Sequence, residues 1–294
     1  MTAGRRTFGE GVVSVIGRAL SHVEVRGKGR ICGRVARSLA RLSSEAYCTP
    51  LPGTSLRIDL RDRIQALMWC NAYEPEIKAV FHAFARDGCV VLDVGAHVGY
   101  FSVLAGGLVG EKGRVHAFEP DPDCFAKLGA NTKRYFQITP WNMAVADRVG
   151  FVQLHRSPLS TESGWGSILE APGEERTRVE VRSTTLDAWL ETQPTERVDF
   201  VKVDAEGAEY RILAGSQRLF DIRKPIIVFE VNEGCLARDA RRPSDLFRLI
   251  EPHGYGIWSV ESGRRRPTGL FLALPEGTLL DALASSGIGL VPAA

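Results

Sequence analysis

The chain has 294 residues, 44% of them hydrophobic, and this apolar content is sufficient for one sizeable core with or without an accessory segment. Its formal net charge of +2 is too small to indicate nucleic-acid binding across the whole surface. No apolar run approaches the roughly 20 residues that cross a bilayer, and the N-terminus lacks the apolar stretch and cleavage site of a secretory signal. We therefore expect a cytoplasmic globular protein with no transmembrane segment and no nucleic-acid partner.

The first 42 residues are strongly basic, with nine Lys and Arg residues against only Glu10 and Glu24. The basic residues are Arg5, Arg6, Arg18, Arg26, Lys28, Arg30, Arg34, Arg37 and Arg41. Apolar residues recur at helical spacing over Val12–Leu20 and Ile31–Leu42, which predicts two short helices. A transit peptide, a membrane-surface contact and a solvated helix pair all fit this pattern, and we favour the solvated pair because such faces are common on ordinary proteins. Residues 1–50 are expected to form a basic helical segment.

The next segment, residues 51–86, is predicted to cap the core. A short strand is expected at Ser55–Leu60, followed by a helix from about Arg61. The sequence Tyr73-Glu74-Pro75-Glu76 then starts a helix that runs toward Arg86 and leads into the first core strand.

From Cys89 onward, short apolar runs alternate with helical patterns, which predicts strands buried on both faces of a mainly parallel sheet. The runs are Val90–Val94, Val115–Phe118, Ile138–Val145, Val198–Val203, Ile226–Val231, Gly256–Val260 and Leu270–Leu274. The last two lie close together and are predicted to be antiparallel. Residues 87–294 are therefore expected to form a doubly wound, Rossmann-like α/β domain with a seven-stranded sheet.

Residues 149–184 interrupt this alternation of strands and helices and are expected to form an insertion in the domain. Phe151–Leu154 and Arg178–Val181 have strand character on either side of the Ser/Gly-rich stretch Ser157–Gly166. A small-residue loop inside an insertion is typical of an active-site lid, and we expect Ser157–Gly166 to be mobile without ligand.

The six cysteines are Cys32, Cys48, Cys70, Cys89, Cys124 and Cys235. They form no Cys-x-x-Cys pair and no Cys/His cluster at metal-ligand spacing, which argues against a zinc site and against a secreted disulfide framework. We expect reduced thiols.

The strongest motif is the run from Val91 to Ser102, in which a buried strand enters a glycine turn and then a helix. Such a turn places backbone N–H groups at the carboxyl edge of the sheet, where doubly wound folds bind ligands. Gly95 lets the turn close, and Gly99 allows a close approach of the helix. The spacing lacks the third glycine of a dinucleotide site, and tight turns also use glycine for structural reasons alone. Asp93 strengthens the ligand interpretation because a buried carboxylate needs a partner.

A second motif follows about one βα unit later, in Phe118-Glu119-Pro120-Asp121-Pro122. An acidic residue at the end of the second strand can accept two ribose hydroxyls, although a helix cap or charged turn would look similar. Together with the glycine turn, Glu119 is predicted to bind ribose.

The third motif is the stretch Asp199–Glu209, where Lys202 and Asp204 lie two apart on a strand and share one face. A charged pair within an apolar strand is costly unless the two groups satisfy each other. An internal ion pair and a polar site opening onto the cleft are both consistent with this pattern.

At these three motifs, and at Tyr73–Glu76 and Thr185–Leu190, the chain resembles the FkbM family of methyltransferases over about residues 50–275. The resemblance implies a sheet in which the strand ending at Asp204 lies between those ending at Asp93 and Glu230. It implies an S-adenosylmethionine-dependent O-methyltransferase acting on a small molecule, natural product or glycan. It also implies a cofactor site at Asp93, Gly95, Ala96, Gly99, Glu119, Asn142 and Ala144.

An aliphatic hydroxyl is a poor nucleophile until its proton has an acceptor, so a base is expected. Our catalytic candidates are Asp204 and Glu230, with Lys202 lowering the pKa of either carboxylate. His97 in the glycine turn and His155 in the insertion are alternatives. A divalent metal is an option that the spacing does not require, and no metal ligand is assigned.

Two other functions remain open from the residues alone. A nicotinamide-dependent oxidoreductase would share the fold and the acidic ribose residue, but the missing third glycine disfavours it. The other alternative is a non-catalytic binding protein with the same fold. The chain keeps the glycines and acidic residues that a degenerate site would be free to lose, which argues against this alternative.

Overall fold

The computed structural model describes residues 8–21, 23, 27–159, 161–170, 173, 175–193, 197–261, 269–278 and 288–293. Of the basic N-terminal residues, Arg5, Arg6 and Arg26 lie outside this described part, as does the acidic Glu24. Within the described ranges, no helix is both long enough and apolar enough to cross a membrane.

The N-terminal segment contains the two predicted helices, α1 (Phe8–Ser21) and α2 (Lys28–Leu39). After them, β1 (Glu45–Cys48) pairs antiparallel with β2 (Leu56–Asp59). The expected strand at residues 55–60 is thus confirmed as β2, whereas β1 was not predicted. The two remaining helices before the core are α3 (Arg63–Trp69) and α4 (Pro75–Phe84). Asp62 caps α3 by accepting hydrogen bonds from the backbone N–H groups of Ile64 and Gln65.

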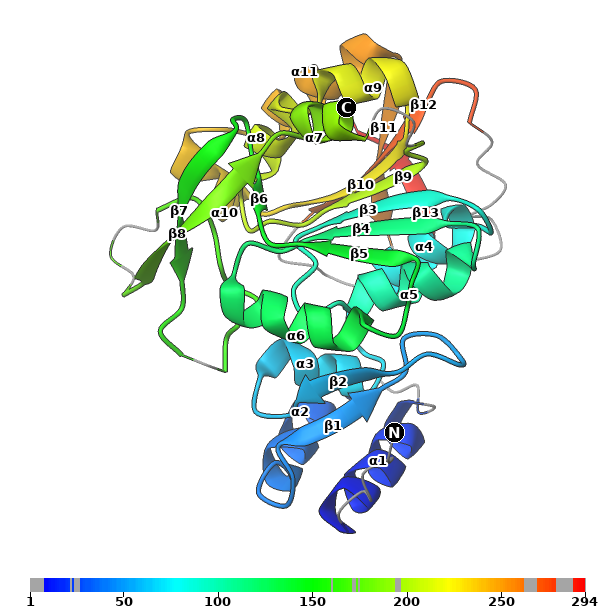
Figure 1. Cartoon of the computed structure of the whole chain (residues 1–294), viewed down its shortest axis with the longest axis vertical. Coiled ribbons are helices and arrows are strands. Elements are labelled where there is room, and N and C mark those ends of the chain that lie inside the picture. The colour runs from blue at the N-terminus through cyan, green and yellow to red at the C-terminus, as the bar shows by residue number, and fades with distance from the viewer. Residues whose placement is uncertain are drawn as a thin grey trace.

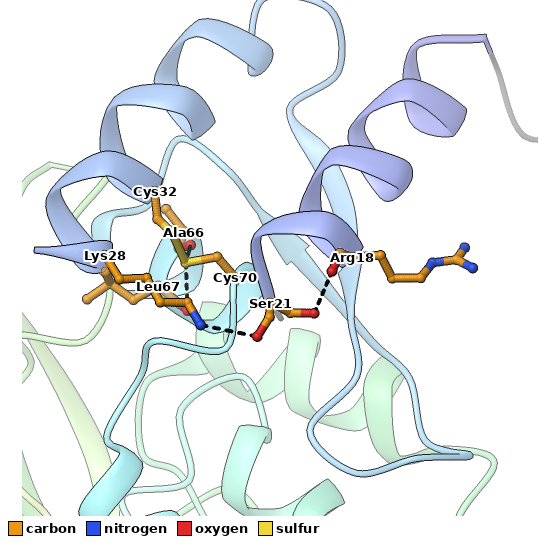
Figure 2. Close-up of a disulfide and its surroundings, with 7 residues drawn as sticks. All are labelled: Arg18, Ser21, Lys28, Cys32, Ala66, Leu67 and Cys70. Atoms are coloured by element: carbon orange, nitrogen blue, oxygen red, sulfur yellow. Dashed lines mark hydrogen bonds between the residues drawn. A yellow bond between two sulfur atoms is a disulfide. The ribbon is translucent and has the colours of Figure 1, made fainter. Parts of the chain in front are cut away.

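The expectation that all six cysteines are reduced is wrong for one pair. Cys32 in α2 and Cys70 at the C-terminal end of α3 form a disulfide, drawn in Figure 2. They are 38 residues apart in the sequence, so only the packing of α2 against α3 brings their Cα atoms to 6.3 Å. The other four cysteines are not in a disulfide.

In the described part of the chain the core is one sheet of eight strands, ordered β13-β11-β12-β10-β9-β3-β4-β5. The strands are β3 (Val90–Val94), β4 (Arg114–Phe118), β5 (Ile138–Trp141), β9 (Phe200–Val203), β10 (Ile226–Val231), β11 (Tyr255–Glu261), β12 (Gly269–Pro275) and β13 (Gly289–Pro292). β3, β4, β5, β9 and β10 are mutually parallel, and β12 runs antiparallel to both β10 and β11. The predicted neighbours are confirmed, because β9 lies between β3 and β10.

Two details of the predicted sheet are wrong. An eighth strand, β13, adds to β11, and its four residues are too short and too exposed to stand out as an apolar run. The predicted strand at residues 138–145 is two strands. β5 ends at Trp141, and β6 (Ala144–Val145) joins a different sheet, because the chain turns away from the core at Asn142.

Helices cover both faces of the sheet, which confirms the doubly wound architecture (Figure 1). On one face, α4, α5 (Tyr100–Val109) and α6 (Pro122–Thr132) pack around Phe81, Tyr100 and Leu104. On the other face lie α7 (Leu186–Thr192), α8 (Glu209–Ala214), α9 (Gln217–Arg223) and α11 (Pro243–Ile250). The strand order reverses between β3 and β9, and such a switch point opens a crevice at the carboxyl ends of the strands.

The insertion forms its own small sheet beside this crevice. β7 (Gly150–Arg156) and β8 (Thr177–Thr184) make an antiparallel pair, and β6 adds to β8. Both stretches with strand character in the insertion are therefore confirmed as strands.

Candidate active site

A cavity of about 790 Å³ lies at the carboxyl ends of β3, β4, β9 and β10. Gly95 and Glu119 line it from the first two strands, and Asp204 and Glu230 from the other two. Residues 163–166 of the insertion and residues 72–74, which precede α4, also line it. A cavity of this volume is within the range of small-molecule sites.

The glycine turn after β3 has a backbone that other residues could not adopt without strain. Gly95 has φ +77°, and a Cβ atom at this position would stand 1.9 Å from the backbone oxygen of Asp204. Its N–H and that of Ala96 both donate to the carbonyl oxygen of Phe118. Gly99 has φ +96° and packs against Leu128 of α6, so it serves the approach of two helices and does not line the cavity.

Lys202 connects two carboxylates beneath this turn. Its Nζ atom lies 3.3 Å from an oxygen of Asp93 and 3.3 Å from an oxygen of Asp204, and it donates to the carbonyl oxygen of Gly95 at 3.1 Å. The Lys202 side chain is only 3% exposed. Burial opposes its charge, but Asp204 and Asp93 together hold the pKa of Lys202 above its usual range. The two interpretations of this motif are therefore combined, since Lys202 is an internal ion-pair partner while Asp204, at 17% exposure, opens onto the cavity.

Asp93 is fully buried and its second oxygen accepts a hydrogen bond from Ser102 Oγ at 2.6 Å. It therefore joins the start of α5 to the end of β3 and does not line the cavity.

Glu119 follows β4 and is held by two backbone groups. One carboxylate oxygen accepts from the N–H of His97 at 2.7 Å, and the other accepts from the N–H of Asp121 at 2.8 Å. Burial raises the pKa of Glu119 to about 7, because these two hydrogen bonds offset only part of the desolvation of the charge. Glu119 lines the cavity, whereas Asn142 lies outside it and donates to the carbonyl oxygens of Glu119 and Pro120.

A chain of hydrogen bonds ties the insertion to the glycine turn. Ser163 Oγ donates to an Asp62 carboxylate oxygen at 2.6 Å and lies 2.7 Å from Nε2 of His97. Because the Ser163 hydroxyl donates its one hydrogen to Asp62, His97 must donate through Nε2–H. Burial lowers the pKa of His97 to about 4, so this imidazole is neutral at pH 7. The other expected histidine, His155, does not line the cavity.

The far end of the cavity is acidic. Asp204, Glu206 and Glu230 line it together, and Tyr73 also lines the cavity within reach of their charges. Burial, reinforced by Asp204 and Glu209, raises the pKa of Glu206 to about 8. Burial also raises the pKa of Tyr73 well above 10, so its hydroxyl remains protonated. Among the residues that the structure describes, no group of three or more His, Cys, Asp or Glu side chains has an arrangement that could hold a metal ion.

Of the predicted site residues, the cavity brings together Gly95, Glu119, Ala144, Asp204 and Glu230. The other predicted site residues do not line the cavity. They are Asp93, Ala96, Gly99, Asn142 and Lys202.

Sequence reasoning missed three residues of this site. Glu206 was visible in the third motif, but its left-handed backbone at φ +50° and its position in the cavity were not. Asp62 and Ser163 are 101 residues apart and carry no local signal of their contact.

Three kinds of comparison relate the chain to known proteins. The sequence model described as the methyltransferase FkbM domain matches residues 93–257. The chain is 28% identical over 218 residues to the AMB antimetabolite synthetase AmbE of Pseudomonas aeruginosa. This alignment covers 60% of this chain and 10% of that protein. It is 25% identical over 159 residues to the hexuronic acid methyltransferase AglP of Haloferax volcanii. This second alignment covers 54% of this chain and 62% of that protein. The chain thus spans less than two thirds of the length of either relative.

Among solved structures, methyltransferase FkbM from Methylobacillus flagellatus KT aligns with a TM-score of 0.42 at 17% identity, over 90% of this chain and 60% of that one. Fibrillarin from Aeropyrum pernix, in complex with natively bound S-adenosyl-L-methionine, aligns with a TM-score of 0.41 at 12% identity, over 67% of this chain and 72% of that one.

Proposed function

Because the chain belongs to the FkbM methyltransferase family, we propose that it uses S-adenosylmethionine to methylate a hydroxyl oxygen of a small molecule, natural product or glycan. The observation that carries the proposal is the cavity at the strand switch point, where the glycine turn and Glu119 meet the carboxylates of Asp204 and Glu230. One end of this cavity suits a nucleoside cofactor and the other suits a hydroxyl-bearing acceptor.

The residues at the β3 and β4 end of the cavity fit the cofactor. S-adenosylmethionine, when bound, supplies an electrophilic methyl group on a positively charged sulfur. Gly95 leaves room at the turn, and Glu119 presents a carboxylate that backbone N–H groups already hold in place. Ala144 lines the same end from β6. We assign Asp93, Ala96, Gly99 and Asn142 to shaping this end.

The residues at the β9 and β10 end fit an acceptor that must lose a proton. A hydroxyl becomes a useful nucleophile when a positioned base accepts its hydrogen. We propose Asp204 as that base, with Glu230 as the alternative, because both carboxylates line the cavity at neighbouring strand ends. Lys202 is proposed as a positioning residue, since its Nζ atom holds Asp204 from the buried side. Closure of residues 163–166 over the acceptor would exclude water from the transfer.

The acceptor class rests on relatives. The similarity to a hexuronic acid methyltransferase supports a sugar hydroxyl, and the similarity to an antimetabolite synthetase supports a natural product. A cavity with several carboxylates and the protonated hydroxyl of Tyr73 offers the hydrogen-bond acceptors and donor that a polyhydroxylated molecule needs.

Calorimetry with S-adenosylmethionine and with NADH tests the cofactor. We expect binding of S-adenosylmethionine alone, weakened by about 1–3 kcal/mol in Glu119→Ala, the size of a hydrogen bond to a charged group. Binding of NADH instead would identify an oxidoreductase.

Transfer of a labelled methyl group to uronic acids, neutral glycosides and natural-product alcohols tests the reaction. We expect label at an oxygen atom in at least one class. A protein that binds the cofactor and labels none of these hydroxyls, or labels nitrogen, would contradict the proposed O-methylation.

A further inference from the structure

Charge is divided unevenly between the N-terminal segment and the rest of the chain. Residues 1–42 carry nine basic and two acidic side chains, a formal charge of +7. Because the whole chain carries +2, residues 43–294 carry −5. A positive region on an otherwise acidic chain favours an anionic partner at that end of the molecule.

The positive charge has a defined face. Arginines recur on α2 at intervals of four and three residues, so their side chains project from one side of the helix, and a further arginine follows in the turn after it. These exposed residues are Arg30, Arg34, Arg37 and Arg41. The opposite side of α2 carries the buried Cys32 and Ala36 and packs on the core. α2 therefore presents its basic side to solvent.

The helix is firmly attached, as Figure 2 shows. The Cys32–Cys70 disulfide ties α2 to α3. The Nζ atom of Lys28, which is buried, lies 3.1 Å from the carbonyl oxygen of Ser21 at the end of α1. A partner that binds the arginine face thus meets a preorganised surface and orders little of the chain on binding.

Exposed apolar side chains occur beside these arginines. Ile31 is 46% exposed next to Arg30, and Leu42 is 65% exposed next to Arg41. Large exposed hydrophobic residues are concentrated in this segment, since Val15, Val23 and Tyr47 are also exposed. Arginines with neighbouring aliphatic side chains match the boundary of a bilayer, where phosphates lie above acyl chains. Single-stranded RNA would instead favour aromatic stacking platforms, and Tyr47 is the one exposed aromatic residue described in residues 8–48.

We propose that the arginine face of α2, with Ile31 and Leu42 at its border, docks the protein on the anionic lipid headgroups of a membrane surface. α2 lies near the cavity, because Leu67 of α3 lines the cavity and also packs against Gly29 of α2. On the function proposed above, docking would bring the active site next to membrane-borne acceptors. That consequence rests on the proposed function, whereas the docking itself does not.

Sedimentation of the full chain with vesicles tests the docking. We expect binding to vesicles of equal parts phosphatidylglycerol and phosphatidylcholine at low ionic strength, little binding to phosphatidylcholine alone, and release by salt. Replacing Arg30, Arg34, Arg37 and Arg41 with glutamine should weaken binding by about 100-fold, since each arginine contributes to the attraction. Leu42→Ser should weaken it by a smaller factor.

The matched control replaces four exposed cations elsewhere, Lys112, Lys133, Arg148 and Arg182, with glutamine. This control variant has the same net charge as the arginine variant and should bind vesicles nearly as well as the unmodified chain. Far-ultraviolet circular dichroism verifies that both variants are folded. If one variant does not fold, the salt titration of the unmodified chain still tests the electrostatic basis of the binding. Failure of the unmodified chain to bind the anionic vesicles would overturn the proposal, as would equal losses in the two variants. Arginine-dependent binding to single-stranded RNA without vesicle binding would assign the face to nucleic acid.

Discussion

The Nζ atom of Lys202 lies 3.3 Å from the Oδ2 atom of Asp204 at the end of the central strand. The same Nζ atom lies 3.3 Å from Asp93 on the neighbouring strand, so one buried cation forms ion pairs with two carboxylates of different exposure. Lys202 and Asp204 of the third sequence motif therefore have different roles. Lys202, with Asp93, stabilises the strand ends, whereas Asp204 is available to the cavity.

Lys202→Met should be much more destabilising than Asp204→Asn. Removing the lysine leaves the fully buried Asp93 without its cation and should cost about 3–5 kcal/mol of unfolding free energy. Asp204→Asn leaves Lys202 paired with Asp93, so the fold and cofactor affinity should persist while turnover falls by about 10²–10⁴. Thermal melting, cofactor titration and turnover assays on both variants measure the stability, the cofactor affinity and the activity, respectively. Full activity in a stable Asp204→Asn protein would remove Asp204 as the base and leave Glu230.

Gly95→Ala should lose both stability and cofactor affinity. Its Cβ atom would stand 1.9 Å from the backbone oxygen of Asp204, and its φ of +77° alone costs about 1–3 kcal/mol in a non-glycine residue. Gly129→Ala is the control, because Gly129 lies within α6 with no atom near its Cβ position and should gain about 0.5–1 kcal/mol. Denaturant unfolding and calorimetry compare the two. Unchanged binding by Gly95→Ala would remove the turn from the cofactor site.

Ser163→Ala should release the insertion from the glycine turn. The variant loses the Ser163 hydroxyl that joins Asp62 to His97, so amide hydrogen exchange across residues 157–166 should accelerate in the absence of ligand. Thr161→Ala is the control, since the hydrogen bond described for Thr161 uses its backbone oxygen, which accepts from the N–H of Arg63. In the unmodified protein the same residues should exchange more slowly when cofactor and acceptor are both bound. Equal exchange with and without ligands would show that this segment is not a lid.

Glu206→Gln should stabilise the ligand-free protein increasingly as the pH rises. Burial raises the pKa of Glu206 from 4.5 to about 8, so the folded state favours the protonated form. The stability contributed by that preference is fully present below pH 4.5 and is lost as the pH rises toward 8. Glutamine stays neutral, and the difference in melting temperature between variant and unmodified protein should grow over this window. Glu180→Gln, at an exposed position on β8, is the control and should show no such trend.

Cys32→Ser should lower the unfolding free energy by about 2–4 kcal/mol under non-reducing conditions, because the disulfide restricts the unfolded chain. Under a strong reductant the unmodified protein should approach the stability of the variant. Cys89→Ser, at a free and partly exposed cysteine, should change little. Alkylation followed by mass spectrometry counts the free thiols. Labelling of all six cysteines in the unreduced, unfolded protein would show that the bridge does not form.

The sequence by itself determined the fold class and much of the part of the cavity that follows β3 and β4. Apolar runs of strand length, separated by helical patterns, require strands that are buried on both faces, and consecutive βα units bring their carboxyl ends to one edge. Gly95 and Glu119 could be predicted for this reason, because each directly follows its own strand and its position depends on local geometry.

Only the tertiary structure decided which residues meet across long separations. Cys32 and Cys70, Ser163 and Asp62, and Lys202 and Asp93 are joined by packing between elements that no local pattern relates. The raised pKa of Glu206 likewise depends on the burial and the neighbouring carboxylates that the completed cavity creates. Side-chain contacts of this kind follow from the relative placement of whole helices and strands, whereas periodicity and turn chemistry report only on the backbone of each element.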